Sequence, residues 1–172
     1  GVAILDEAIY LRKEGITAPI LVLGYCRPEY VQQALKYNVA LTVFQSEWLK
    51  KAESYMEEKD RLNIHLKFDT GMGRIGITEE DEGKTLIEGI KSSSSFHVEG
   101  VFTHFATADE LNKDYFNKQY AKFLTVLKGL EEHGINPTYI HCGNSATGIR
   151  FPDQSFNMFR LGISMYGLSP SM

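Results

Sequence analysis

Helical and strand-like patterns of apolar residues alternate along the whole chain. Apolar side chains recur every three to four residues, the spacing that places them on one face of a helix, in the segments 5–14, 28–37, 46–56, 78–91 and 115–130. Between these segments lie apolar or alternating runs that are typical of strands, at 19–24, 39–44, 63–69, 98–105, 138–142 and 158–161. The opening residues Gly1–Ile4 form one more strand-like run. Strands that alternate with helices predict a parallel sheet covered by helices.

Several helix ends carry a local signal. Gly15 and Gly134 follow the last periodic residues of two segments and are expected to end those helices. Ser46 is expected to cap the helix that it precedes, and Thr78 with Asp81 to cap the next one.

No linker or change of composition divides the chain, so we expect one domain over residues 1–172. Six or seven strand–helix units in one domain favour an incomplete (β/α)8 barrel over a doubly wound sheet. The chain begins in mid-strand and stops in a loop, with no start methionine or polar leader. We therefore expect a fragment of a longer protein, with a truncated first strand.

Composition excludes several classes of function. The chain has 172 residues, of which 43% are hydrophobic and 23% charged, and its net charge is −4, with no basic cluster that would indicate nucleic-acid binding. No run of about 18 apolar residues predicts a membrane helix in this segment. Cys26 and Cys142 lie far apart and are interpreted as reduced thiols, which favours the cytoplasm. No metal site is expected.

Polar residues lie at the carboxyl ends of four of the expected strands or directly after them. They are Asp69, Thr70 and Arg74, then Thr103 and His104, then His141, Asn144 and Ser145, and finally Arg160 with Gly162. Catalytic groups of a (β/α)8 barrel gather at the carboxyl ends of its strands. The four positions together predict one polar site.

The segment Gly71–Gly76 spells G-x-G-x-x-G, which has two interpretations. A dinucleotide-binding loop should follow the first apolar strand and open a helix at once, with an acidic residue at the end of the next strand. Here the segment comes late, and Glu99 begins a strand instead of ending one. The alternative is a tight loop that needs glycine at positive φ, and the context favours it.

Four segments, in this order, resemble the alanine racemase family: Lys67–Gly76, which contains DTGMGR, Thr103–Asp109, His141–Ala146 and Arg160–Ser171. The resemblance covers essentially the whole chain. It implies an isomerase that uses pyridoxal 5′-phosphate (PLP), forms a homodimer, and converts L-alanine to D-alanine for peptidoglycan synthesis in the bacterial cell wall. The alternatives are a serine racemase of the same fold, a barrel protein of PLP homeostasis that does not racemise, and a structural or regulatory barrel that binds nothing.

The resemblance implies that Arg160 donates a hydrogen bond to the pyridine nitrogen of PLP. A guanidinium cannot hand over a proton, so the ring nitrogen stays unprotonated, which favours exchange of the α-proton over transamination. His104 would support Arg160 from beside the ring. The alternatives are a surface ion pair for Arg160 and a core histidine, satisfied by backbone, for His104.

The substrate side of the implied site rests on Arg74. Its guanidinium would reach the phenolic oxygen of PLP and the substrate carboxylate, a bidentate task that suits arginine. Lys67 matches a family position whose amine can be carbamylated and then pairs with Arg74. The alternative for Lys67 is an ordinary solvated lysine.

The phosphate of PLP would be bound by the Ser145 hydroxyl and by the backbone N–H groups of Gly162 and Ile163, and Asn144 would orient this loop. Glycine permits close approach, and clustered amides favour an anion. The remaining histidines are interpreted as structural: His65, His97, His133 and His141. The aromatic stripe Tyr115–Phe123 is expected to be core.

The same resemblance places the PLP-bearing lysine and a phosphate-binding tyrosine before Gly1. It places the tyrosine base in a β-rich C-terminal domain of the partner subunit, after Met172. Racemisation needs a proton removed from one face of the α-carbon and delivered to the other. No catalytic base is therefore assigned within the chain, and we expect the isolated chain to be inactive and the longer protein to be active.

Overall fold

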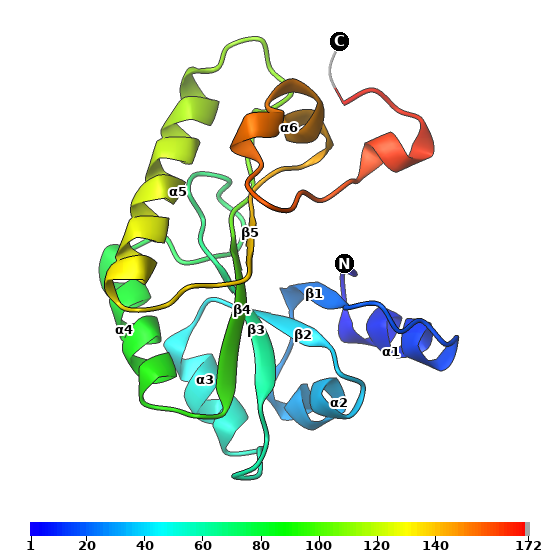
Figure 1. The fold of residues 1–172 in the computed structure, drawn as a ribbon, viewed down its shortest axis with the longest axis vertical. Coiled ribbons are helices and arrows are strands. Elements are labelled where there is room, and N and C mark those ends of the chain that lie inside the picture. The colour runs from blue at the N-terminus through cyan, green and yellow to red at the C-terminus, as the bar shows by residue number, and fades with distance from the viewer. Residues whose placement is uncertain (171–172) are drawn as a thin grey trace. The chain divides into compact units, whose positions relative to one another are not determined.

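The computed structural model describes residues 1–170 and contains one parallel sheet whose strands lie side by side in chain order (Figure 1). The five strands are β1 (Leu21–Tyr25), β2 (Ala40–Val43), β3 (Leu62–Lys67), β4 (Phe96–Phe102) and β5 (Tyr139–His141). A doubly wound sheet reverses its strand order at a switch point, and this sheet does not. The strand order is that of a (β/α)8 barrel, as the sequence predicts.

Two single bridges extend this order beyond the five strands. Val2 pairs in parallel with Val22, and Gly143 pairs in parallel with Phe159. The expected strand at 158–161 is thus wrong as a regular strand, because only one residue pair forms there. Phe159 and Leu161 are about half exposed, so burial does not hold this segment in a longer ladder.

Five of the six helices in the described residues lie where the apolar periodicity predicts them, and the last one was not predicted. The six are α1 (Leu5–Lys13), α2 (Val31–Lys36), α3 (Ser46–Glu53), α4 (Glu80–Lys91), α5 (Asp114–Glu132) and the unpredicted α6 (Ser145–Arg150), with short 3₁₀ turns at Pro28–Tyr30, Pro152–Gln154 and Ile163–Tyr166. Gly15 and Gly134 adopt positive φ just after α1 and α5, which confirms them as helix ends. No helix within the described residues is both long and apolar enough to cross a membrane.

Both predicted caps are wrong. Ser46 is the first residue of α3, and the extended residue before it is Gln45. Glu79 occupies the cap position of α4 without a side-chain cap bond, so Thr78 lies one residue outside the helix. Three acidic residues in the first turn of α4 already stabilise the positive end of the helix, which makes a side-chain cap dispensable there.

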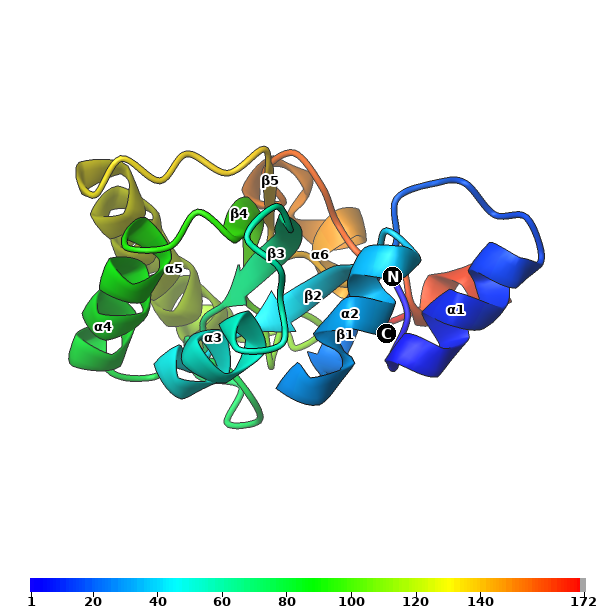
Figure 2. The ribbon, with the colours of Figure 1, turned by 90° about the horizontal axis from the view of Figure 1, so that it is seen from below.

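The chain divides into two compact units. The first comprises Gly1–Lys67 and Glu79–Glu99. Within it α3 and α4 pack side by side (Figures 1 and 2). Their buried faces carry Trp48, Leu49 and Ala52 on α3, and Leu86, Ile87 and Ile90 on α4. The Trp48 indole donates a 2.7 Å hydrogen bond to the Cys26 carbonyl, which satisfies the polar atom of this buried ring.

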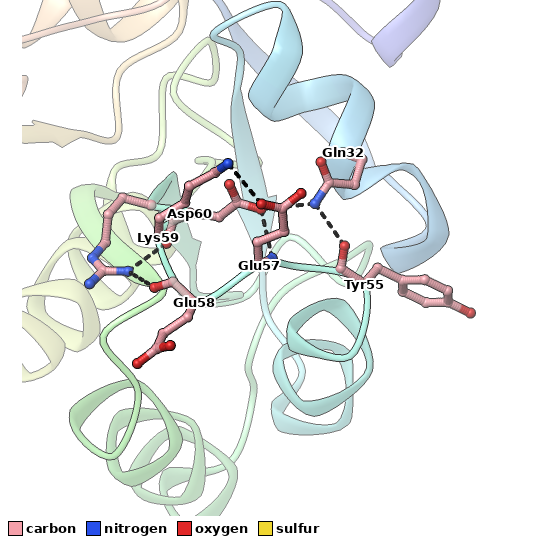
Figure 3. Close-up of polar contacts among 7 residues, drawn as sticks. Gln32, Tyr55, Glu57, Glu58, Lys59 and Asp60 are labelled. Atoms are coloured by element: carbon pink, nitrogen blue, oxygen red, sulfur yellow. Dashed lines mark hydrogen bonds and ion pairs between the residues drawn. The ribbon is translucent and has the colours of Figure 1, made fainter.

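The connection from α3 to β3 is held by the side chains of Gln32 and Asp60 (Figure 3). Gln32 Nε2 donates to the Tyr55 carbonyl and to Asp60 Oδ2, both at 2.8 Å. Asp60 Oδ2 also accepts from the Glu57 amide at 2.8 Å. These bonds hold the loop that precedes β3 against α2.

The second unit comprises residues 68–78 and 100–170. An aromatic core holds it together: Phe105 and Phe151 both pack on the fully buried Phe116 of α5, with ring centroids 4.7 and 4.3 Å away. The expected aromatic stripe of α5 is confirmed at Phe116 and Phe123. It is wrong at Tyr115, which is 43% exposed. This second unit contains most of the candidate site.

Candidate cofactor and substrate site

The Arg160 guanidinium is held by the carboxyl ends of β4 and β5. Nη1 lies 2.6 Å from His141 Nδ1, and Nη2 lies 3.1 Å from His104 Nδ1. Nη2 also donates to the carbonyl oxygens of Thr103 at 2.9 Å and Cys142 at 3.5 Å. Because a guanidinium can only donate, both imidazoles must accept at Nδ1, and in their neutral forms both carry the proton on Nε2.

The surroundings of Arg160 are those of a functional cation. Desolvation, with a smaller contribution from the positive charge of Arg74, lowers the pKa of Arg160 to about 10. The Phe102 ring lies 5.2 Å from the guanidinium carbon and stacks on His141 at 4.6 Å. Among residues 1–170, no carboxylate pairs with Arg160 and no hydrogen bond uses its Nε. The surface ion pair considered for Arg160 is therefore not what the structure shows.

The Asp69 carboxylate organises the loop that follows β3. Its Oδ1 accepts from the amides of Gly71, Met72 and Gly73 at 2.9, 2.6 and 3.1 Å, and its Oδ2 accepts from the Arg74 amide at 2.8 Å. Burial alone would raise the pKa of Asp69, but the four N–H donors outweigh it and lower this pKa below its ordinary value. Asp69 therefore stays ionised and fixes the backbone of Arg74, whose side chain is exposed.

The glycines of this loop are required by its backbone. Gly71, Gly73 and Gly76 all have positive φ, at 140°, 71° and 137°. No helix opens at the loop, since α4 begins only at Glu80. The dinucleotide-binding interpretation is wrong, and the tight loop with positive φ is confirmed.

Asn144 and the turn around it shape the start of α6. Asn144 Oδ1 accepts from the Thr147 amide at 3.0 Å, and Nδ2 donates to the Phe105 carbonyl at 3.4 Å. The side chain thus caps α6 and ties it to the segment after β4.

Ser145 brings the chain's last described segment to the start of α6. Its buried Oγ accepts from the amides of Gly162 at 2.9 Å and Ser164 at 3.4 Å. The Ser164 hydroxyl is buried and, within residues 1–170, has no hydrogen-bond partner. The Ser145 hydroxyl and the amides of Gly162 and Ser164 therefore lie within hydrogen-bond distance of one another, and clustered amides of this kind suit an anion.

Lys67 belongs to the first unit, at the end of β3, whereas the loop of Arg74 belongs to the second. Lys67 is only 5% exposed, so it is not the solvated lysine considered as an alternative.

Sequence reasoning missed three residues that take part in this arrangement. His141 was interpreted as structural although it lies at the carboxyl end of a strand, the same signal that singled out His104. Gln119 contacts the site segments from α5, and it is a polar residue within an apolar stripe. Ser164 lies four residues after Arg160, where only backbone groups were expected to bind. Within the described residues no group of three His, Cys, Asp or Glu side chains could hold a metal ion.

Comparison with known proteins matches residues 1–170 to the family described as "Alanine racemase, N-terminal domain". The alanine racemase of Halalkalibacterium halodurans is 53% identical over 171 residues, and that of Geobacillus kaustophilus is 55% identical over 171 residues. Each match covers 99% of this chain and 44% of the relative. The chain therefore spans less than half the length of these relatives.

Solved structures give the same result. The crystal structure of alanine racemase from Bacillus anthracis with bound L-Ala-P has a TM-score of 0.95 at 49% identity, covering 99% of this chain and 44% of that one. The histidine racemase of Leuconostoc mesenteroides subsp. sake has a TM-score of 0.89 at 30% identity, covering 96% of this chain and 44% of that one. Racemases named for different amino acids thus share this fold.

Proposed function

We propose, since this chain belongs to the alanine racemase family as its N-terminal domain, that the longer protein containing it interconverts L- and D-alanine with PLP as cofactor. The observation that carries the proposal is the environment of Arg160. Its guanidinium is held by two imidazoles and by backbone carbonyls, and it has no carboxylate partner among residues 1–170. A cation fixed in this way is suited to an electron-rich acceptor atom of a ligand. Residues 1–172 then form a partial PLP-binding barrel.

The residues around Ser145 fit the phosphate of PLP. The Ser164 hydroxyl is buried and has no hydrogen-bond partner within residues 1–170, and a buried donor without an acceptor is destabilising. Phosphate oxygens accept several hydrogen bonds at once, from the hydroxyl of Ser145 and from the backbone N–H groups of Gly162 and Ile163. Asn144 keeps this turn in place by capping α6.

Arg160 donates to the ring nitrogen of the cofactor and keeps it free of a proton. With a pKa of about 10, the guanidinium remains charged at neutral pH. His104 and His141 accept from its two terminal nitrogens and so fix its plane. When bound, PLP withdraws electrons from the α-carbon of an amino acid, and a ring nitrogen without a proton limits this withdrawal to proton exchange.

Arg74 binds the substrate carboxylate and the phenolic oxygen of the cofactor. Asp69 holds the Arg74 backbone, so the guanidinium extends from a fixed point. Lys67, once carbamylated, is an anion that can pair with Arg74. The groups that remove and return the α-proton come from parts of the longer protein outside residues 1–172.

The remaining features of the proposal follow from the family. The longer protein is a cytoplasmic homodimer whose partner subunit completes the site, and it supplies D-alanine for peptidoglycan. A serine racemase of the same fold is the second candidate. The observation behind it is the histidine racemase, whose similarity covers 96% of this chain although it is named for a different amino acid.

The test uses the full-length protein that contains this chain, saturated with PLP and given L-alanine or L-serine separately. Chiral chromatography follows formation of the D-isomer. We expect alanine to react faster than serine. If serine reacted faster, serine would be the substrate in place of alanine. A PLP-loaded protein that racemises neither amino acid would support the PLP-homeostasis alternative.

A further inference from the structure

One buried polar side chain on α5 connects the two loops that carry His104 and Arg74. Gln119 is 1% exposed, and the other buried residues of α5 (Phe116, Phe123 and Leu130) are apolar. Burial of an amide without hydrogen bonds costs several kcal/mol. A polar side chain at such a position must therefore form hydrogen bonds with its neighbours.

Every polar group of the Gln119 amide is used. Oε1 accepts from the Ala106 amide at 2.9 Å, and Nε2 donates to Thr70 Oγ1 at 3.4 Å and to the His104 carbonyl at 3.3 Å. The hydroxyls of Thr70 and Thr103 are 2.8 Å apart. Thr70 begins the loop that leads to Arg74, and His104 and Ala106 belong to the segment after β4. One side chain therefore sets the spacing of two strand ends.

Two further residues of α5 contact the same loop. The Tyr115 hydroxyl donates to the Gly71 carbonyl at 2.7 Å, and Lys122 Nζ donates to the Thr78 carbonyl at 3.3 Å. Residues 115, 119 and 122 follow the i, i+4, i+7 spacing of one helix face. Figure 1 shows the loop after β3 lying beside α5. The helix thus holds the loop near both of its ends.

The fit at Gly71 is close. A Cβ atom there would lie 2.6 Å from the Tyr115 hydroxyl and 3.3 Å from Gln119 Cγ, and Gly71 has a φ of 140°. Only glycine lets the backbone approach α5 this closely. The loop is therefore seated on this helix face by shape as well as by hydrogen bonds.

We propose that Gln119 is a positioning residue for racemisation, which sets Arg74 and His104 in register through its bonds to Thr70, His104 and Ala106. Tyr115 assists at the start of the loop. The expected effect on kcat/KM rests on the proposed function, whereas the expected effect on hydrogen–deuterium exchange does not. A misplaced catalytic group lowers the rate even when the protein remains folded.

The experiment uses the full-length, PLP-loaded protein and the variant Gln119→Met, which keeps the volume of the side chain and removes all three hydrogen bonds. We expect kcat/KM for alanine to fall about tenfold. Hydrogen–deuterium exchange should become faster in peptides covering residues 69–73 and 103–107. Gln119→Glu keeps the acceptor for Ala106 but loses both donated bonds, so its exchange should rise mainly in residues 69–73.

The matched control is Phe123→Leu, which alters the next buried residue on the same helix face. Phe123 packs against Phe156, with ring centroids 5.6 Å apart. We expect this variant to lower the melting temperature while leaving kcat/KM within about twofold, because it touches no positioning contact. If kcat/KM fell by the same factor for each degree of lost melting temperature in Gln119→Met and in Phe123→Leu, the proposal would be overturned.

Tyr115→Phe keeps the proposal testable if Gln119→Met does not fold. Tyr115 is partly exposed, so loss of its hydroxyl should leave the melting temperature unchanged and raise KM for alanine several-fold, about the effect of one lost hydrogen bond. An unchanged KM together with unchanged exchange in residues 69–73 would contradict the role of this helix face. If the wild-type protein does not racemise alanine, the proposed function fails, and the exchange measurements still decide the inference.

Discussion

At the scale of single residues, the Asp69 carboxylate supplies the hydrogen-bond acceptors that a helix or strand would otherwise supply to backbone amides. Four backbone amides that no helix or strand satisfies point to its two oxygens. Hydrogen bonds to a charged group contribute more than those between neutral groups. The loop therefore depends on the ionised state of this side chain.

We predict that Asp69→Asn lowers the free energy of unfolding at pH 7 by about 1–3 kcal/mol. The asparagine amide nitrogen cannot accept from the Arg74 amide. The folded-state pKa of Asp69 is below its unfolded value of about 3.9, so the stabilisation is complete above that value and is lost as the pH falls through the folded pKa. Urea unfolding of both proteins from pH 7 to pH 3 checks this. A stability difference that stays constant over this range would contradict the account.

Residue identity predicted part of the candidate site. Arg160, His104 and Ser145 could be singled out because each lies at the carboxyl end of an expected strand or shortly after it, and the structure brings Arg160 and His104 into contact. His141 was misjudged because nothing in a sequence shows which of several histidines faces an arginine. Gln119 was missed because its partners lie 49 and 15 residues away along the chain.

At the scale of elements, the loop Gly71–Gly76 contains glycines that are needed for two different reasons, positive φ and close approach to backbone. A Cβ on Gly76 would lie 2.6 Å from the Asp69 nitrogen and 2.9 Å from the Phe68 carbonyl carbon, whereas a Cβ on Gly73 would meet nothing within 4 Å. Both residues have positive φ. Only the first position combines backbone strain with a backbone clash.

We predict that Gly73→Ala costs about 1 kcal/mol of stability, the cost of strain alone, and that Gly76→Ala costs at least twice as much. The clash is with backbone, which cannot move aside without breaking the 2.8 Å bond from the Asp69 amide to the Ile77 carbonyl. Thermal unfolding of the two variants provides the comparison. Equal losses at the two positions would show that the close approach at Gly76 has no energetic weight.

Periodicity located five helices, because burial of one face determines where a helix lies, but it missed α6, which has only six residues. It failed at the helix starts, where a plausible Ser46 or Thr78 cap competes with first-turn acidic residues and backbone geometry. The expected strand at 158–161 is reduced to one bridge since its apolar residues Phe159 and Leu161 are half exposed. Apolar composition alone did not distinguish a strand from an exposed connection.

At the scale of the whole molecule, the strand order carries the fold. The five strands follow one another in the sheet as they do in the chain, and this could be expected from regular alternation without any linker. The identity of the substrate could not be expected from the fold, because this fold is shared by racemases named for different amino acids. The racemases of similar structure that are named for alanine and for histidine illustrate the point.

The central claim is that this chain carries the cofactor and carboxylate contacts of an amino-acid racemase. Nuclear magnetic resonance of L-alanine in D2O, with the full-length PLP-loaded protein, tests it most directly. We predict loss of the α-proton signal with deuterium in both enantiomers, and a rate reduced on the order of 10²-fold in Arg74→Ala, as for loss of a group that contacts the reacting substrate. Retention of the α-proton by the PLP-loaded wild-type protein would contradict the account.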